Sequence, residues 1–174
     1  MTDRPTIPPI GRDEFRAAMA RIATAVSVIT TDGPEGRHGM TASAVASVSD
    51  EPATILACIH RSTLMNSRLK SNGVMCVNVL SDRHDALSRL FANAGSTLDE
   101  RFASSAWDML ATGAPVMQDA AIALDCEIVE VAEVATHSVF FGELRALRLA
   151  ESASPLLYYN RGFHSIGTGI LSED

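Results

Sequence analysis

The chain has 174 residues, which suits one domain with a sizeable core, and 47% of them are hydrophobic. Its net charge of -7, from 14 basic and 21 acidic residues, argues against a nucleic-acid partner and against a polybasic membrane anchor, since both need a basic surface. No apolar run is long enough for a transmembrane helix, and the first residues lack the apolar core of a signal peptide. A cytoplasmic protein with no membrane contact is therefore expected.

The N-terminal part of the sequence predicts an arm, a helix and a strand. Residues 1–10 contain three prolines and are expected to form a flexible arm. A helix is predicted from Asp13, as its cap, to about Arg21, because apolar residues recur at helical spacing and form a stripe for the core or a subunit interface: Phe15, Ala18, Met19 and Ile22. Segment 25–31 is a predicted strand, and the turn cluster after it sends the next strand back antiparallel.

The central stretch, residues 39–80, predicts a strand, a second strand, a helix and a third strand. Residues 43–49 alternate between small hydroxyl-bearing and apolar side chains, which is typical of a strand with one apolar face. After a proline-containing break, 53–59 is rich enough in apolar residues for a buried strand. A short helix over 64–72, closed by a glycine, leads into a strand over 74–80.

This stretch offers an anion site without a glycine-rich loop. Ser62 is a predicted N-cap, the first N–H groups of the helix lack internal partners, and Arg61 adds a positive charge. Small residues on the preceding strand would let a flat ligand approach the backbone, with hydroxyls ready to donate: Thr41, Ala42, Ser43 and Ala44. The alternative interpretation is an ordinary strand–helix–strand unit with a capped helix.

The segment after the third strand predicts a helix and a long loop. Asp82 can cap a helix over 83–91 with one apolar side. Residues 93–114 read as a loop, and a loop of this length in a compact domain is usually functional. Its aromatic residues, Phe102 and Trp107, either cover a flat ligand or pin the loop to the core.

The last third of the chain predicts strands only. Alternating patterns mark strands over 122–128 and 139–147, and two short strands, 156–159 and 163–166, flank a turn at Asn160–Gly162. With about eight strands and short helices, this regular alternation favours an antiparallel barrel over a parallel doubly wound sheet.

The sequence lacks the motifs of several common classes of enzyme and nucleotide-binding site. There is no glycine-rich dinucleotide fingerprint after a strand, no phosphate-binding P-loop and no hydrolase or metalloprotease motif. Cys58, Cys76 and Cys126 lie in apolar strand segments at spacings that do not indicate zinc, so buried reduced thiols are expected.

The order of motifs resembles the flavin reductase family, the small reductase components of two-component monooxygenases. The resemblance covers nearly the whole chain, and the ordered set is more specific than any one segment. Within the family, the branch acting in pyrimidine ring-opening looks closest, and the corrin-reducing branch nearly as close. The segments are GMTASAVASVSDEP (39–52), LSRLFA (87–92), ERFASSAW (100–107), GAPVMQDAAIALDCEIVEV (113–131), THSVFFGELRAL (136–147) and LLYYNRGFHSIG (156–167).

The resemblance implies a mainly β fold, a flavin-binding split β-barrel with short peripheral helices, in one domain over 11–174. It implies flavin, FMN or FAD, in a groove at a homodimer interface, and NADH or NADPH as hydride donor. Carried over by motif, the flavin-contacting residues are Thr41, Ala42, Ser43, Ala44, Cys58, Ile59, His60, Ser62, Thr63, Asn66, Phe91, Ala92 and Phe102.

A second set of residues is implied for the nicotinamide dinucleotide. His137 stands where the family often has Gly-Asp-His, although here the sequence is Ala-Thr-His. The resemblance places it near the nicotinamide; a hydrogen-bonded structural histidine is the alternative. Tyr159 and Arg161 would lie beside it, with Arg161 either pairing with a dinucleotide phosphate or completing a tight turn. The remaining histidines, His38, His84 and His164, are expected at surface or turn positions.

The implied function is an NAD(P)H-dependent flavin reductase. Hydride passes from nicotinamide C4 to flavin N5, so no acid, base or metal is obligatory, and reduced flavin goes to a partner oxygenase. Two alternatives remain: a flavin-dependent reductase of another acceptor such as a corrin cobalt centre, and a flavin carrier or sensor without turnover.

Overall fold

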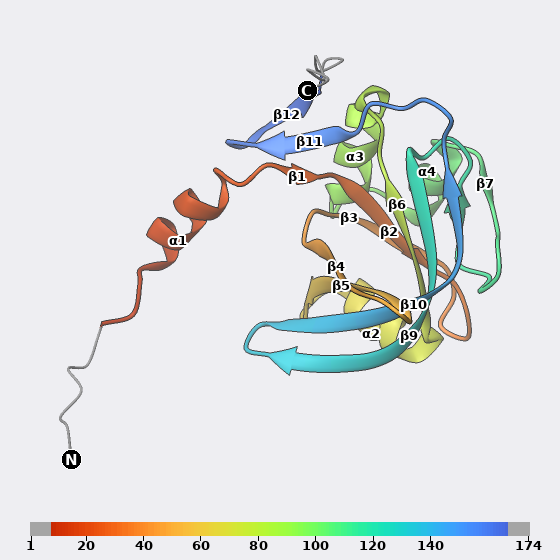
Figure 1. Ribbon diagram of the computed structural model, residues 1–174, viewed down its shortest axis with the longest axis horizontal. Helices are drawn as coiled ribbons and strands as arrows, with labels where there is room; N and C mark the ends of the chain where they lie inside the picture. The colour runs from red at the N-terminus through yellow and green to blue at the C-terminus, as the bar shows by residue number, and fades with distance from the viewer. Residues whose placement is uncertain (1–7, 167–174) are drawn as a thin grey trace.

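The structure is a computed structural model and describes residues 8–166. Its centre is one seven-stranded antiparallel sheet (Figure 1). Its strands are β2 Ser27–Thr31, β3 His38–Ala42, β4 Val45–Asp50, β5 Ala53–His60, β6 Val74–Val79, β9 Ile122–Val134 and β10 His137–Leu149. Two small sheets consist of β1 Thr24–Ala25, β11 Leu156–Tyr159 and β12 Gly162–Ser165, and of β7 Trp107–Asp108 and β8 Val116–Met117.

The connection between the two edge strands makes the large sheet a split barrel. The strand order is β3-β2-β6-β9-β10-β5-β4, so β3 and β4 lie at opposite edges. A flat sheet of this size would separate its edges by roughly 29 Å. The chain from Ala42 to Val45 reaches at most about 11 Å. The sheet must therefore curve until its edges meet near Ser43 and Ala44, which confirms the predicted mainly β, split-barrel fold.

The prediction of one strand over 43–49 is wrong at its start. Ser43 and Ala44 form the crossover between the two edges, and β4 begins at Val45 and is exposed on nearly all of its length. Alternation along the sequence cannot reveal that a chain changes sheet edge, because both sides of the crossover keep an extended pattern. The other predicted strands agree with the structure within a few residues, apart from longer strands at β9 and β10.

The first two helices differ in burial: α1 buries no residue and α2 buries three. The helix α1 (Arg12–Met19) projects from the body and buries none of its residues (Figure 1). Its N-cap is Gly11, so the predicted cap, Asp13, lies inside the first turn, where its charge favours the helix dipole. The helix α2 (Leu64–Asn72) ends at Gly73 in the left-handed region, as predicted. Most of the predicted arm, residues 1–10, lies outside the described residues.

The segment after β6 has more structure than the sequence indicated. The predicted helix divides into a short 3-10 turn (Asp82–His84) and α3 (Asp85–Ala92). The predicted loop contains a further helix, α4 (Leu98–Ala103). Thr97 accepts from the Glu100 N–H and Glu100 accepts from the Thr97 N–H, at 3.2 and 2.7 Å. This capping box was readable in the sequence and was missed.

Two apolar clusters hold the site in place. The barrel interior packs fully buried side chains such as Ile29, Met75 and Phe140. A second cluster lies between the sheet and helices α3 and α4 and includes Phe91. Phe91 contacts Gly39 so closely that a Cβ there would lie 2.8 Å from the ring. The absence of a side chain at Gly39 lets α3 approach the end of β3.

Candidate functional site

A cleft of about 490 Å³ opens between the end of β3, helix α3 and the β11–β12 hairpin. Its lining brings together four of the predicted flavin residues with one predicted dinucleotide residue: Thr41, Ala42, Ser43, Ala92 and Arg161. Segments about 50 and 120 residues apart in the sequence therefore meet here. The Thr41 hydroxyl donates to the Ser88 carbonyl at 2.6 Å, so this hydroxyl, predicted to be ready to donate to a ligand, is already used.

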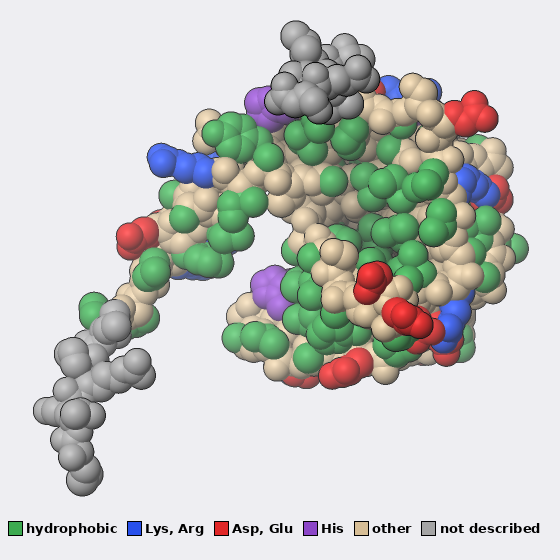
Figure 2. Space-filling model, in the orientation of Figure 1, with side chains coloured by type: hydrophobic (Ala, Val, Ile, Leu, Met, Phe, Trp, Pro, Cys, Tyr) green, Lys and Arg blue, Asp and Glu red, His purple; other side chains and the backbone are tan. Residues whose placement is uncertain are grey.

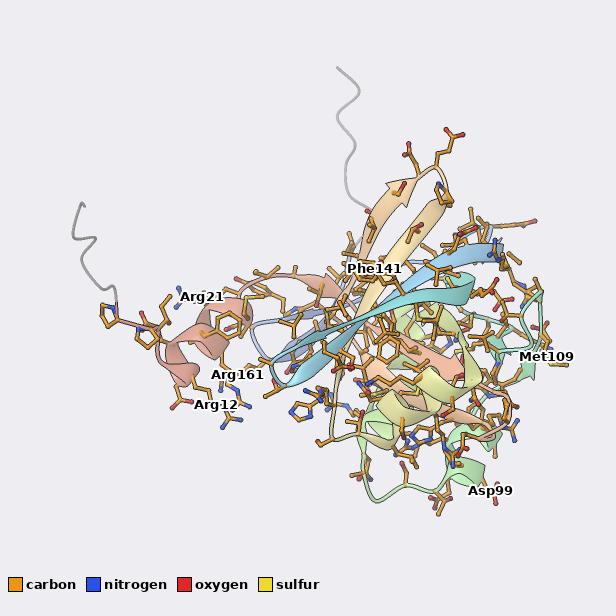
Figure 3. All side chains as sticks on the ribbon, turned by 90° about the horizontal axis from the view of Figure 1, so that it is seen from below. Arg12, Arg21, Asp99, Met109, Phe141 and Arg161 are labelled. Atoms are coloured by element: carbon orange, nitrogen blue, oxygen red, sulfur yellow. The ribbon has the colours of Figure 1, made fainter. Side chains whose placement is uncertain are left out.

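A second hollow of about 510 Å³ continues the cleft toward α1 and shares Ser43, Tyr158 and Arg161 with it. Figure 3 shows Arg161 beside α1. The far wall consists of apolar side chains from the α1 segment, Phe15, Met19 and Ile22, which are 58%, 46% and 52% exposed. Figure 2 shows hydrophobic side chains gathered on α1 and the hollow between it and the main body.

The start of α2 differs from its prediction. Its N-cap is Thr63, whose Oγ1 accepts from the Asn66 N–H at 3.3 Å; Ser62, the predicted cap, lies one residue outside. The N–H and the hydroxyl of Ser62 instead approach His60 Nδ1 at 3.2 and 2.8 Å. The first turn of α2 carries no acidic residue, which leaves its positive dipole end uncompensated by a carboxylate.

Two histidines meet at the edge of the barrel beside this helix. The antiparallel register of β5 and β10 pairs His60 with His137, and their rings lie edge to face with centroids 5.0 Å apart. Because the Ser62 N–H can only donate, His60 Nδ1 accepts and Nε2 carries the proton of the neutral ring. The Thr136 hydroxyl lies 2.9 Å from His137 Nδ1. The two imidazoles thus have fixed positions beside the start of α2.

A network of ion pairs and hydrogen bonds around the Glu133 carboxylate joins α2 to the turn between β9 and β10. Glu133 accepts from Lys70 at 2.5 Å and from Ser138 at 3.0 Å, and pairs with Arg61 at 2.8 Å. The pKa of its carboxyl is lowered, chiefly by the hydrogen bond from Lys70 and further by Ser138 and Arg61. Arg61 is therefore neutralised by Glu133, which corrects the expectation that it adds a full charge to the anion site.

Four of the predicted flavin residues are buried in the framework of the site. The Asn66 amide donates to the Ile59 carbonyl and to the Ser138 hydroxyl at 3.1 and 2.9 Å, so it joins α2 to the barrel. Ile59 points into the barrel core, and Phe91 packs beneath Gly39. These side chains, with Phe102, support the groove and do not line the cleft.

The structure decides the role of the aromatic residues of the 93–114 segment. Phe102 is buried, with its ring centroid 5.6 Å from Phe91 and 5.0 Å from Trp107. The Arg37 guanidinium lies over its outer side, 4.4 Å from the centroid. Buried Arg101 donates to the Gly39 carbonyl at 2.9 Å. Phe102 therefore pins the segment to the core, and it does not border the cleft.

The β11–β12 hairpin and α3 supply cleft residues that were not predicted or were assigned to a neighbour. Tyr158, and not Tyr159, lines the cleft, because consecutive strand residues point to opposite faces. Tyr159 stacks near His164 instead. Phe163 and, from α3, Arg89 complete this wall. His137 lines neither hollow, whereas Arg161 lines both.

Two histidines expected at surface or turn positions are buried. His38 is 9% exposed, and burial, with Arg68 and Arg101 nearby, lowers its pKa to about 4. His84 is also buried, with Nδ1 accepting from the Ser81 N–H at 3.1 Å and Nε2 3.1 Å from an Asp119 oxygen. Of these three predicted histidines, His164 alone is exposed, in line with its prediction.

A family model described as a flavin reductase like domain matches residues 19–167 of the chain. The chain belongs to this family. The FMN reductase (NADH) RutF of Variovorax paradoxus is 46% identical over 159 residues, which span 91% of this chain and 88% of that protein.

Two solved structures of flavin reductases resemble this structure. The Streptomyces globisporus NADH:FAD oxidoreductase SgcE6, in complex with NAD and FAD fragments, has a TM-score of 0.86 at 26% identity and covers 96% of this chain and 99% of its own. BorF, the flavin reductase component of a bacterial two-component tryptophan halogenase, has a TM-score of 0.83 at 28% identity, over 90% and 98% of the two chains.

Residues 8–166 contain neither a metal-binding cluster nor a membrane-spanning helix. No three His, Cys, Asp or Glu side chains gather there as a metal site would require. No helix in that range is both long and apolar enough to cross a membrane.

Proposed function

We propose that this protein is an NADH-dependent FMN reductase whose reduced flavin is used by a separate oxygenase. The observation that carries the proposal is the cleft at the barrel edge, built from the end of β3, α3 and the β11–β12 hairpin. It occurs in a chain 46% identical to an enzyme named FMN reductase (NADH). A groove where strand ends meet is a usual position for a cofactor site.

The residues at the crossover fit a flavin. Ala42, Ser43 and Ala44 have small side chains, so a flat ring can approach the backbone between the two edges of the sheet. Helix α2 begins one strand away, because the Cys58 N–H donates to the Ala44 carbonyl at 3.0 Å and β5 leads directly into the helix. The acid-free N-terminus of α2, with Ser62 and Thr63, would hold the flavin phosphate.

The protein's own task in this proposal is positioning. When both are bound, nicotinamide C4 supplies a hydride that flavin N5 accepts. His60 and His137 at one end of the groove would orient the two rings, and no residue has to move a proton. The Glu133 network keeps the β9–β10 turn, and with it His137, against the start of α2.

A homodimer of single-domain subunits, each folded from residue 11 onward, is part of the proposal. The apolar stripe of α1 is exposed and borders the second hollow, and covering it with another subunit would remove this surface from water. Light scattering at working concentration should give the mass of a dimer. A monomer that still binds flavin would contradict this part of the proposal.

One assay separates the competing functions. We expect purified protein to oxidise NADH when free FMN is added, with slower or no turnover when NADPH replaces NADH, and FAD compared in parallel. Turnover only when a corrin is also present would indicate a corrin reductase. Flavin binding without NADH oxidation would indicate a carrier or sensor. Addition of a flavin-dependent oxygenase with its substrate then tests the transfer of reduced flavin.

A further inference from the structure

Arg61 is the arginine nearest in sequence to the start of α2, where the proposed function places the flavin phosphate. It stands two residues before the N-cap Thr63, so the two Cα atoms are at most about 7.6 Å apart. A free guanidinium at this position could reach a phosphate at the helix start. There it would add a full charge and a bidentate contact to the helix dipole.

The guanidinium of Arg61 is held on the β9–β10 turn instead. Its Nε pairs with Glu133 Oε2 at 2.8 Å, and its Nη1 donates to the Ala135 carbonyl at 3.3 Å. The Arg61 N–H donates to the Thr136 carbonyl at 2.9 Å, so the same turn fixes both the backbone and the side chain. Two of the three guanidinium nitrogens are thereby engaged, and the charge is neutralised.

Glu133 is anchored independently of Arg61. Its Oε1 pairs with Lys70 at 2.5 Å, and both carboxylate oxygens accept from the Ser138 hydroxyl, at 3.0 and 3.1 Å. Ser138 is fully buried, so these bonds tie the carboxylate to the barrel. The pKa of the carboxyl is lowered, first by the hydrogen bond from Lys70, so the group stays charged at neutral pH. This carboxylate is therefore a constant competitor of a phosphate for Arg61.

Lys70, the second cation on Glu133, is poorly placed to act on the same phosphate. It lies in the last turn of α2, six residues after Leu64, which is about 9 Å along the helix axis. An effect of Glu133 on a phosphate at the helix start is therefore expected to act through Arg61.

We propose that Glu133 lowers the affinity for the flavin phosphate by holding Arg61 on the β9–β10 turn, so that FMN is bound chiefly through its ring and leaves after each turnover. This assignment rests on the proposed function, in which reduced flavin passes to a separate oxygenase. Such a transfer needs a flavin that dissociates. A charged arginine on the phosphate would slow dissociation, because changes in affinity at one site act mainly on the off-rate.

A purely structural role of the pair makes a different prediction. Ala135 has a φ of 48°, in the left-handed region that residues other than glycine adopt at a cost, and the contacts of Arg61 and Glu133 could serve only to stabilise this turn. Loss of Glu133 would then loosen the turn and weaken the binding of FMN and riboflavin equally. In our proposal it strengthens the binding of FMN alone.

The variants separate charge from fold. Glu133→Gln removes the negative charge and keeps an oxygen that can accept from Lys70 and Ser138. Arg61→Gln removes the cation. Glu130→Gln is the matched control: Glu130 lies three residues before Glu133 in β9, is also exposed, and forms no ion pair within residues 8–166. Its replacement changes the net charge by the same amount.

The probes are FMN and riboflavin, which lacks the phosphate, titrated by fluorescence quenching without turnover. We expect Glu133→Gln to bind FMN about fivefold more tightly, the value of one exposed ion pair, with riboflavin affinity unchanged. The gain should disappear at about 1 M salt and in the double variant with Arg61→Gln. Arg61→Gln alone and Glu130→Gln should bind FMN as the unaltered protein does.

The contrary outcomes are distinct. FMN affinity that is unchanged or weaker in Glu133→Gln would overturn the assignment, as would an equal change for riboflavin. Weaker FMN binding in Arg61→Gln alone would overturn it too, because Arg61 would then already hold the phosphate; this variant decides the question even if Glu133→Gln does not fold. Failure of the unaltered protein to oxidise NADH with FMN would refute the proposed function instead, while the titrations would still decide the role of Glu133.

Discussion

The two walls of the groove are fixed to the molecule in different ways. On the barrel side, β10 pairs with β5 from His137 to Glu143 and with β9 along its whole length, and the buried Asn66 amide joins α2 to β5 and β10. On the hairpin side, β11 pairs with β1 at Thr24 and Ala25, Leu156 forms backbone hydrogen bonds with Val26 and Leu80, and α1 buries nothing. One wall is part of the core along its length, and the other is tied to the core mainly at Leu156, the buried first residue of β11.

This difference in attachment suits the two walls to different ligands. Local stability follows buried contacts and protected hydrogen bonds, so the barrel side should open only with global unfolding and the hairpin side more readily. A rigid wall suits the cofactor whose phosphate and ring must be held in one geometry. A less constrained wall suits a dinucleotide that enters and leaves in each turnover. The following tests contrast the two walls, from the largest expected effect to the smallest.

The largest contrast should appear between two phenylalanines. Phe140 is fully buried in the barrel, so Phe140→Ala should lower the free energy of unfolding by about 3–5 kcal/mol. Phe163 is half-buried in the hairpin, and Phe163→Ala should cost about 1–2 kcal/mol. Urea unfolding followed by the fluorescence of Trp107 measures both. Equal losses would show that the hairpin is as firmly integrated as the barrel.

Acid should destabilise the barrel side through His38. Its pKa is about 4 in the folded state against 6.5 for an unperturbed histidine, because burial and two arginines disfavour the charged ring. The unfolded chain binds this proton first, so stability present above pH 6.5 is lost as the pH falls toward 4. Between pH 7 and pH 5 the loss is on the order of 2 kcal/mol.

Unfolding measured at both pH values in His38→Gln and in a control, His164→Gln, tests this. The decrease on acidification should shrink only in the His38 variant, because His164 is an exposed residue of the hairpin. A pH dependence that is identical in both variants would assign the acid sensitivity to other groups.

At the start of α2, Thr63 is the N-cap and its neighbour Ser62 is not, so the two substitutions separate capping from phosphate binding. Thr63→Ala removes the N-cap and should destabilise the protein by about 1 kcal/mol. Ser62→Ala leaves the cap in place, so it should weaken FMN binding without lowering the thermal midpoint. Fluorescence quenching of FMN and thermal unfolding of both variants are the measurements. If Ser62→Ala leaves the dissociation constant for FMN unchanged, the flavin phosphate binds elsewhere.

The smallest expected effect concerns His137. If it only positions the nicotinamide, His137→Ala should lower kcat/KM for NADH roughly 2- to 13-fold, the value of one neutral hydrogen bond. Flavin affinity should be unaffected. A loss well beyond about 100-fold would indicate proton transfer. Collapse of flavin affinity, with unchanged NADH kinetics at saturating flavin, would make His137 a flavin residue.

The sequence by itself determined the strands, most helices and the family. Alternation of period two survives in β9 and β10 because one face of each is buried, and glycine ended α2 because its C-cap needs a left-handed residue. The ordered motifs also located the strand ends that meet at the cleft. These features depend on local chemistry, which neighbouring residues in the sequence express directly.

Only the tertiary structure decided which side chains face the groove. Tyr158 and Tyr159 are adjacent and chemically equal, and the pairing of β11 with β1 and β12 selects the first for the cleft. Arg89 became a cleft residue because α3 packs on Gly39, 50 residues earlier in the chain. Such contacts join distant segments, and their strength depends on packing geometry that no local sequence pattern encodes.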